Sequence, residues 1–181
     1  VLLPAVVDAV APLPVIAAGG IADGRGLAAV LALGGAGAWI GTRFLATPEA
    51  DAHEDWKRRI VAAEGADTVY TELFDIGWPQ APHRVLRNST FDQWEAAGRP
   101  PSGQRPGEDE VPARQPDGTP LPRYGFGSPL PGASGDIEAT CLYAGQSAGL
   151  VRDIVPAGAL VKRIVAEAEA ALSSANALRR L

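Results

Sequence analysis

"VIAAGGIADGRGLAAVLALGGAGAWIGTRFL", residues Val15–Leu45, is the stretch that decides the fold class. Two short apolar runs, each followed by glycine, enclose a segment with the leucine and valine spacing of a helix. Such runs are typical of strands in a parallel sheet, and parallel strands need a helical crossover between them. The stretch therefore predicts a strand–helix–strand unit of an α/β fold, in which Gly34 and Gly35 end the helix.

Glycines follow both predicted strands and leave backbone amides uncovered. Gly19-Gly20 follows the first strand, and Gly41-Thr42 follows the second. Glycine has no Cβ, so an anion can approach its amide closely, and a helix beginning near Asp23 adds the positive end of its dipole. One glycine pair alone is equally consistent with a tight turn. Two consecutive strand ends of this kind fit the phosphate site that the loops after the last two strands of a (β/α)8 barrel often build.

Three segments resemble the nitronate monooxygenase family, formerly called 2-nitropropane dioxygenases. The first is PVIAAGGIADGRGLAAVLALGGAGAWIGTRFLATPEA, residues 14–50, and the second is LYAGQSAGLV, residues 142–151. The third, DTVYTELFDIGWPQAPHRVLRNS at residues 67–89, is similar to the part of the family that follows the barrel. Flavin-dependent enoyl-acyl-carrier-protein reductases belong to the same superfamily, so the motifs are more specific for the superfamily than for the reaction.

The resemblance implies the C-terminal part of a TIM-type (β/α)8 barrel, with a helical C-terminal appendage and non-covalently bound FMN. The FMN phosphate would lie on Gly19-Gly20 and on Trp39-Ile40-Gly41-Thr42. The segment Gly145-Gln146-Ser147 would lie near the flavin. Trp39 replaces the smaller or polar residue expected at its position, so its backbone rather than its side chain would serve.

The resemblance also implies a reaction, the oxidation of an alkyl nitronate by O2 to a carbonyl compound and nitrite. The family's catalytic histidine, which acts on the substrate near the flavin, and its early strands would precede Val1, so no catalytic residue is assigned. With no methionine in the sequence, the chain is expected to be a fragment. The alternatives are an NAD(P)H-dependent enoyl-acyl-carrier-protein reductase and a non-catalytic piece that binds at most a phosphate. An IMP-dehydrogenase-like barrel would need a catalytic cysteine loop, which the surroundings of Cys141 do not resemble.

Composition limits the remaining functional classes. A formal net charge of −5 over 181 residues argues against nucleic-acid binding, and no run of apolar residues is long enough to span a membrane. The single cysteine, Cys141, cannot form an internal disulfide, and with only His53 and His83 beside it no metal cluster is expected. A cytoplasmic setting is expected. The sequence leaves open whether the protein forms a homo-oligomer.

Three parts follow along the chain. Residues 1–75 are predicted to form the last βα units of the FMN-binding barrel, with helices at 2–11 and 47–65. Residues 76–135 hold an extended segment, a short helix capped near Ser89 or Thr90 and an irregular Pro/Gly-rich loop from 98 to 135. Residues 136–181 are predicted as helices that pack back on the barrel, one starting at Asp136. The buried face of the last helix is expected to carry Leu160, Val161, Ile164, Val165, Ala168 and Leu172.

Several polar side chains could have a functional role, but a structural role is at least as well supported by the sequence. We expect His53 to be solvated, His83 to hydrogen-bond locally or to face solvent, and Cys141 to be buried and inert. Arg25 and Arg43 either neutralise the phosphate or lie on the surface. The run Lys57-Arg58-Arg59 is expected to form a solvated face.

An incomplete barrel has a predictable energetic weakness. Two strands leave an open sheet edge and an uncovered face, so the apolar strand residues are expected to lack packing partners. The isolated chain is therefore expected to be poorly stable. The residues concerned are Val15, Ile16, Ala17 and Ile40.

Overall fold

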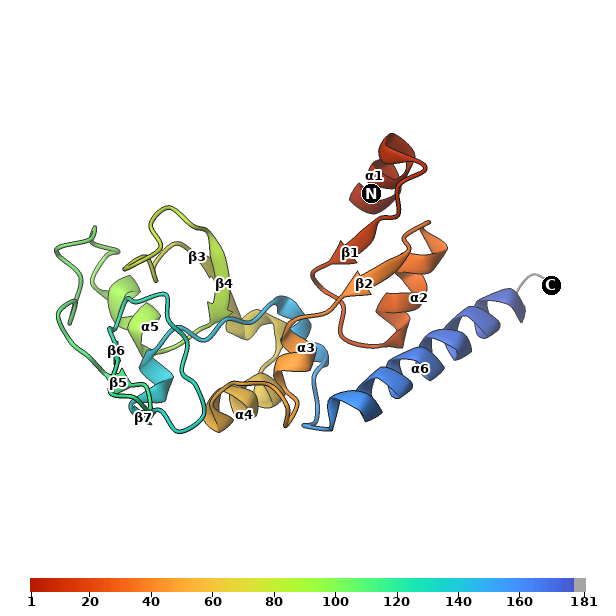
Figure 1. Cartoon of the computed structure of the whole chain (residues 1–181). Helices are drawn as coiled ribbons and strands as arrows, with labels where there is room; N and C mark the ends of the chain where they lie inside the picture. Colours follow the sequence, from red (N-terminus) through yellow and green to blue (C-terminus); the bar gives the residue numbers. More distant parts are fainter. Residues whose placement is uncertain (178–181) are drawn as a thin grey trace.

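Two short parallel strands joined by a helix organise the N-terminal part of the molecule. The computed structural model describes residues 1–177. β1 (Ile16–Ala18) pairs in parallel with β2 (Gly37–Trp39), and α2 (Gly24–Ala32) makes the crossover (Figure 1). Gly34, at φ +88°, follows the helix as its stop signal predicts. The predicted strand–helix–strand unit is therefore confirmed.

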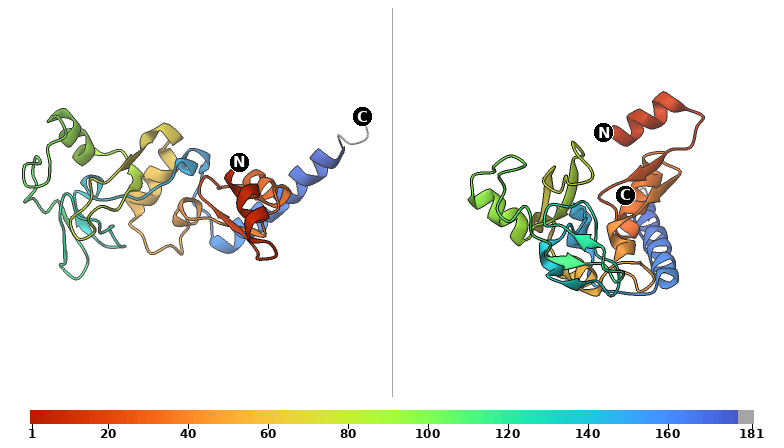
Figure 2. Two further views of the ribbon diagram at one scale, coloured as in Figure 1. Left: turned by 90° about the horizontal axis from the view of Figure 1, so that it is seen from above. Right: turned by 60° about the vertical axis from the view of Figure 1, so that its left-hand side comes forward.

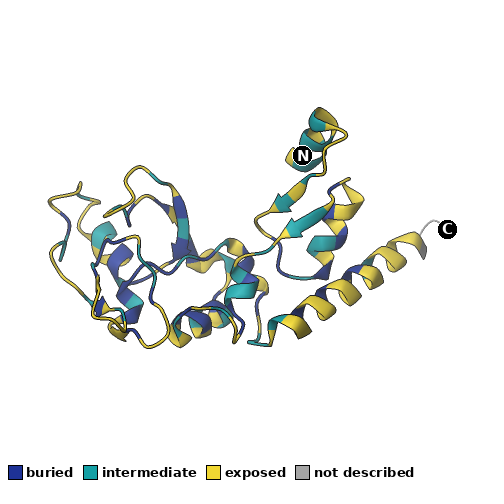
Figure 3. Cartoon of the chain, viewed as in Figure 1, coloured by how far each residue is buried: buried dark blue, intermediate teal, exposed yellow. Residues whose placement is uncertain are grey.

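The β1–β2 sheet stays open among the described residues. Neither strand pairs with a third, so residues 1–177 do not close a barrel. Ile16 is 60% exposed, as expected for a strand without packing partners. The predicted first helix is present as α1 (Leu2–Val10), and it buries none of its residues. Figure 3 shows this exposure along α1 and the strands.

The long C-terminal helix α6 (Ala157–Ala177) packs on α2, and the two lie side by side in both views of Figure 2. Gly24 makes the close approach possible, because a Cβ there would lie 2.3 Å from the Cβ of Glu167. The predicted apolar face is only half buried. Val161, Val165 and Leu172 are exposed, whereas the buried residues are Leu160, Ile164 and Ala168.

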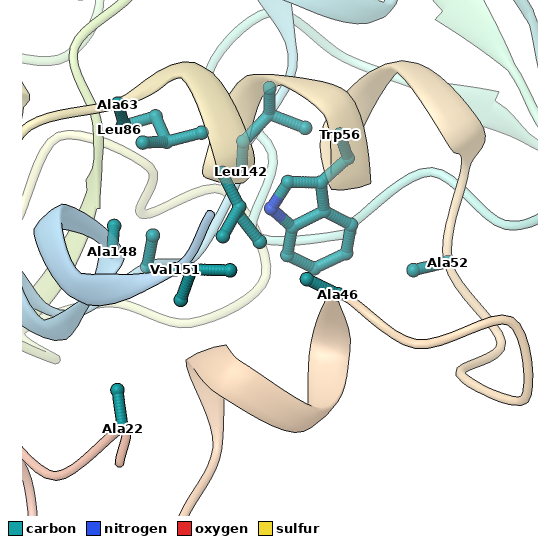
Figure 4. Packing of buried hydrophobic residues seen from close by; sticks show 11 residues of the cluster. Ala22, Ala46, Ala52, Trp56, Ala63, Leu86, Leu142, Ala148 and Val151 are labelled. Atoms are coloured by element: carbon teal, nitrogen blue, oxygen red, sulfur yellow. The ribbon is translucent and has the colours of Figure 1, made fainter. Parts of the chain in front are cut away.

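Two helices connect this unit to the rest of the molecule. α3 (Thr42–Leu45) follows β2 directly, and α4 (Glu54–Ala62) starts later than the predicted helix at 47–65. His53 caps α4, because its Nδ1 accepts a hydrogen bond from the Asp55 amide at 3.1 Å. The indole of Trp56 packs among small side chains and Leu142 in the main apolar cluster (Figure 4).

Lys57 contradicts the expectation of a solvated basic face. Its side chain is 2% exposed, and its Nζ donates to Glu54 at 3.1 Å, which compensates the buried charge. The next residue in the run, Arg58, is exposed and pairs with Asp55. The basic run therefore straddles the boundary between core and surface, because successive residues of a helix point in different directions.

An antiparallel hairpin begins the second half of the molecule. β3 (Thr68–Thr71) follows the short 3₁₀-helix η1 (Gly65–Asp67) and pairs with β4 (His83–Leu86). α5 (Ser89–Ala96) then starts one or two residues before the predicted place, because Asn88 rather than Ser89 or Thr90 is its cap. The Asn88 side chain accepts from the Phe91 amide at 3.0 Å and donates to the Thr140 carbonyl, so one residue caps the helix and anchors a distant segment.

The Pro/Gly-rich loop contains more order than its composition predicts. β5 (Ala113–Arg114), β6 (Pro120–Leu121) and β7 (Ser134–Gly135) form a small antiparallel sheet in the order β6-β5-β7. This sheet has its own apolar cluster, which the periodicity of the sequence does not reveal. Its buried members are Ala113, Leu121, Ala133 and Ile137.

The helix predicted from Asp136 is wrong. The structure has two short 3₁₀-helices, η2 (Ile137–Ala139) and η3 (Gln146–Leu150), with extended backbone between them. That backbone runs along β4, where Leu86 N donates to Leu142 O at 2.9 Å and Ala144 N donates to Arg84 O at 3.1 Å. Tertiary pairing overrides the apparent helical spacing, because Leu142 and Ala144 also satisfy the two-residue repeat of an extended chain.

Candidate functional site

The ends of β1 and β2 provide uncovered amides at one edge of the sheet. Parallel pairing of Ala18 with Trp39 brings the loops that follow the two strands to the same side. Gly19 and Gly20 lie at φ +95° and +74°, a region that favours glycine. A Cβ added at Gly19, Gly20 or Gly41 would have no atom within 4 Å. This open space fits a bound anion.

The same amides remain free to donate. Outside the β1–β2 ladder, the amides of Gly19, Gly20 and Gly41 donate no hydrogen bond within residues 1–177. Because exposed amide groups without partners favour an oxygen-rich anion, the donor set suits a phosphate. FMN, which carries one phosphate, is therefore compatible with the geometry of these two loops.

The N-terminus of α2 is not free to bind a phosphate, contrary to what the sequence suggests. Asp23 accepts from the Gly26 amide at 3.2 Å, and Glu167 of α6 accepts from the Gly24 amide at 2.9 Å. Two carboxylates of the chain thus occupy the positive end of this helix. The expectation that the helix beginning near Asp23 offers its dipole to a phosphate therefore needs correction.

Both arginines that follow the glycine loops pair with carboxylates of the chain, and Arg25 lies on the surface, as one of the two alternatives predicts. Arg25 is exposed and pairs with Asp23 at 2.5 Å. Arg43 is 2% exposed, and its guanidinium donates to Asp153 at 2.6 Å and to the Ala46 carbonyl. Arg43 therefore ties α3 to the segment before α6, which is a structural role that neither sequence-based alternative described.

A groove of about 650 Å³ joins the two motifs that the sequence singled out. Its walls include Gly41 and Thr42 on one side and Tyr143 and Gly145 on the other. The Thr42 Oγ1 accepts a hydrogen bond from the Gly145 amide at 2.9 Å, which fixes one segment against the other. The Thr42 hydroxyl proton remains available to a ligand.

The other predicted site residues differ in their placement. Ile40 lines the groove. Trp39 is 73% exposed and does not line the groove. Gln146 is exposed and starts η3 beyond the groove lining, and Ser147 is buried. Their contact with a flavin stays a prediction.

Sequence reasoning missed part of the groove wall. Trp56 and Arg84 line it together with Tyr143. Arg84 alternates with His83 and Val85 along β4, so its side chain shares a face with Leu86, which packs in the Trp56 cluster. The alternation was visible in the sequence, but the partner of that face was not.

His83 and Cys141 are both buried. His83 Nδ1 lies 2.7 Å from the Ala81 carbonyl, which confirms local hydrogen bonding, while its Nε2 has no partner among the described residues. Burial raises the pKa of the Cys141 thiol to about 12, although the nearby Tyr143 hydroxyl opposes the shift. This thiol is therefore protonated at neutral pH, as expected of an inert cysteine.

The part of the chain that the structure describes contains neither a metal-ligand cluster nor a membrane-spanning helix. No three histidine, cysteine or acidic side chains within residues 1–177 come together as a group able to hold a metal. Within the same residues, no helix combines the length and apolar character needed to cross a bilayer.

Comparison with known proteins places these features in a wider context. A family model described as nitronate monooxygenase matches residues 1–167. A Mycobacterium tuberculosis protein named (3aS,4S,5R,7aS)-5-hydroxy-7a-methyl-1-oxo-octahydro-1H-indene-4-carboxyl-CoA dehydrogenase is 36% identical, over 98% of this chain and 56% of that protein. A probable nitronate monooxygenase of Staphylococcus saprophyticus is 31% identical, over 92% of this chain and 42% of that protein.

A solved structure, FabK from Thermotoga maritima, superposes with a TM-score of 0.75 at 33% identity. The superposition covers 98% of this chain and 51% of FabK. The chain thus spans about half the length, or less, of the proteins it matches. Its mixed α/β fold corresponds to one portion of such longer chains.

Proposed function

Because the chain belongs to the nitronate monooxygenase family, we propose that it supplies the FMN-phosphate-binding part of a nitronate monooxygenase. The proposed reaction is the oxidation of an alkyl nitronate by O2 to a carbonyl compound and nitrite. In this proposal residues 1–75 are the last βα units of a TIM-type barrel, and residues 136–181 pack back on it.

One observation carries the proposal. The adjacent ends of two parallel strands present free amides at Gly19, Gly20 and Gly41, with no atom in the space that a side chain would take. A phosphate accepts several such hydrogen bonds at once, and each is strengthened by its charge. The donor set thus supports a phosphorylated cofactor over a neutral one.

The chain's own residues would bind and orient rather than transfer protons. FMN, when bound, supplies the ring system that accepts electrons from the substrate. Gly19, Gly20 and Gly41 would hold the phosphate, and Thr42, fixed by Gly145, would add a hydroxyl donor. The catalytic group stays unassigned, because His53 caps α4 and His83 is not part of the groove lining.

A second candidate reaction has support from one relative. The M. tuberculosis protein is named as a dehydrogenase of a carboxyl-CoA ester, so thioester redox chemistry occurs on this family's scaffold. The corresponding proposal here is an NAD(P)H-dependent enoyl-acyl-carrier-protein reductase. Turnover of propionate 3-nitronate with O2 and without nicotinamide supports the first proposal, whereas NAD(P)H-dependent reduction of an enoyl thioester would replace it.

A substitution at Gly41 tests the phosphate site directly. Gly41→Val places a side chain where the phosphate would approach, and the open space around Gly41 leaves the fold intact. Loss of charge-assisted hydrogen bonds should weaken FMN binding, measured by quenching of flavin fluorescence, by at least about tenfold. Riboflavin, which has no phosphate, should bind weakly and equally to both proteins.

Gly37→Val is the matched control, since Gly37 starts β2, the strand that Gly41 follows, and also has no atom within 4 Å of an added Cβ. It should bind FMN as the unchanged protein does. Equal FMN affinity for the Gly41→Val and unchanged proteins would reject the site.

A further inference from the structure

Each of the two glycine loops leads into a helix that is bound to α6. Gly41 directly precedes α3, whose second residue is Arg43, and Gly20 lies shortly before α2, which begins at Gly24. α6 lies beside α2 in both views of Figure 2. Because the loops are short, the position of each loop depends on the position of the helix that follows it.

Two ion pairs that share one carboxylate connect α3 to α6. Arg43 is 2% exposed, and its Nη2 donates to the Asp153 carboxylate at 2.6 Å. Arg163 of α6 donates to both oxygens of the same carboxylate, at 2.7 Å and 3.0 Å. A bidentate pair of this kind fixes direction as well as distance. The start of α3 is therefore held at a defined place relative to α6.

One turn further along α6, Glu167 holds the start of α2. Its Oε2 accepts a hydrogen bond from the Gly24 amide at 2.9 Å. Arg163 and Glu167 are four residues apart in the helix, so their side chains lie on the same side of α6. Both line one cavity of about 640 Å³, and its lining also includes Arg43 and Asp153. The contacts to the two helices thus lie within one turn of α6.

We propose that Arg163 and Glu167 are positioning residues, which set the separation of the two glycine loops at which one phosphate contacts both. This inference rests on the proposed function and concerns the same site. Amide hydrogen bonds to oxygen form at about 2.7–3.2 Å, so donors on two loops reach one phosphate only at a defined separation. The two residues with their partners, Asp153 and Gly24, are called the α6 brace.

Arg163→Gln tests the brace without leaving a buried charge unpaired, because Arg43 and Asp153 keep their own ion pair. The variant should bind FMN at least about fivefold more weakly, measured by quenching of flavin fluorescence, with unchanged affinity for riboflavin. A general loss of structure would weaken both ligands. Arg163→Lys should recover part of the FMN affinity, because one ammonium group replaces a bidentate contact.

Arg152→Gln is the matched control for the loss of a positive charge. Arg152 lines the same cavity, but its ion pair is with Glu64, at 3.3 Å, outside the brace. This variant should bind FMN as the unchanged protein does. Equal FMN affinity of the Arg163→Gln and unchanged proteins would overturn the proposal.

Variants of Glu167 distinguish a brace from a carboxylate that only occupies the N-terminus of α2. The brace predicts weaker FMN binding in Glu167→Ala and recovery in Glu167→Gln, whose amide oxygen can still accept from the Gly24 amide. Stronger FMN binding in Glu167→Ala would overturn the proposal, because the freed helix N-terminus would then be a phosphate site itself.

Hydrogen exchange without FMN separates failure of the brace from failure of the flavin site. The Leu45 amide donates to the Gly41 carbonyl at 3.0 Å, and the Leu27 amide donates to the Asp23 carbonyl at 3.3 Å. These amides report on the opening of α3 and of the first turn of α2. Arg163→Gln should speed the exchange of both by at least about fivefold, measured by NMR, and unchanged exchange of both would overturn the brace. Unchanged FMN affinity in Gly41→Val rejects the phosphate site, and the exchange result alone then decides whether α6 couples the loops.

Discussion

In the Pro/Gly-rich region, a buried arginine and its carboxylate partners stabilise the chain where few apolar side chains are available to pack. Arg105 is 6% exposed, and its guanidinium lies 4.3 Å from the Tyr124 ring centroid. It donates to Asp75 at 2.7 Å and to Glu108, so its charge is compensated on two sides. A segment rich in proline and glycine has few side chains to bury, and this network supplies its order instead.

Glu108 makes the stability of this network dependent on pH. Burial raises the pKa of its carboxyl, but hydrogen bonds from Arg105, the Arg105 amide and Ser102 outweigh it and lower the pKa from 4.5 to about 2. A depressed folded-state pKa stabilises the protein above pH 4.5, and the contribution is lost as the pH falls from 4.5 to about 2. The free energy of unfolding should fall less steeply over this range in Glu108→Gln.

Glu72→Gln is the control for this experiment, because Glu72 is exposed and its side chain makes no hydrogen bond among the described residues. Its acid profile should follow that of the unchanged protein. If the acid profile of Glu108→Gln coincides with those of Glu72→Gln and the unchanged protein, the Glu108 carboxylate contributes nothing to the free energy of unfolding.

Between elements, the packing of α6 on α2 depends on one glycine. The helices approach so closely at Gly24 that an added Cβ would lie 2.3 Å from Glu167 Cβ and 2.4 Å from the Ala168 amide nitrogen. Both contacts involve atoms near the backbone of α6, which cannot move without shifting the helix. Glu167 adds the bond to the Gly24 amide, so packing and capping occur at the same point.

Gly24→Ala should therefore destabilise the protein although alanine favours helices. Overpacking at this crossing should lower the free energy of unfolding by about 1–3 kcal/mol, measured by urea denaturation. Gly158→Ala is the matched control, since Gly158 lies in α6 with no atom within 4 Å of an added Cβ. It should raise stability by up to about 1 kcal/mol. A stabilised Gly24→Ala protein would contradict the close approach.

Across the whole molecule, burial is unevenly distributed. Two apolar clusters, around Trp56 and around Phe74, join α4, β4 and the segment near Tyr143. The α1, β1 and β2 residues contribute no member to either cluster among the described residues. The outer part of the N-terminal unit therefore relies on short-range contacts and on the packing of α2 against α6.

This difference should appear in hydrogen exchange. Backbone amides of β1 and β2 should exchange faster than those of β3 and β4, because local opening of an open sheet exposes little buried surface. Hydrogen exchange of the chain at neutral pH, followed by mass spectrometry, measures the exchange rates of both sheets. Equal protection of the two sheets would indicate that the N-terminal sheet is covered, for example by self-association, and a concentration series would identify that case.

Local sequence was enough for the βαβ unit, for the stop at Gly34 and for the start of α5 within a residue or two. Each depends on neighbours along the chain, such as a glycine in the left-handed region or an Asn88 side chain that reaches the next turn. The adjacency of the two glycine loops also follows from local pattern, since parallel strands joined by one crossover end at one edge. These features are decided within about thirty residues.

Tertiary contacts decided the rest. Glu167 reaches the Gly24 amide from 143 residues away, so no local pattern could reveal that the α2 N-terminus is occupied. The segment at Leu142 satisfies both helical and extended spacing, and only its pairing with β4 selects the extended form. Arg84 lines the groove for the same reason. Side-chain pattern specifies a face, whereas the element that covers the face is determined by packing free energy summed over distant parts of the chain.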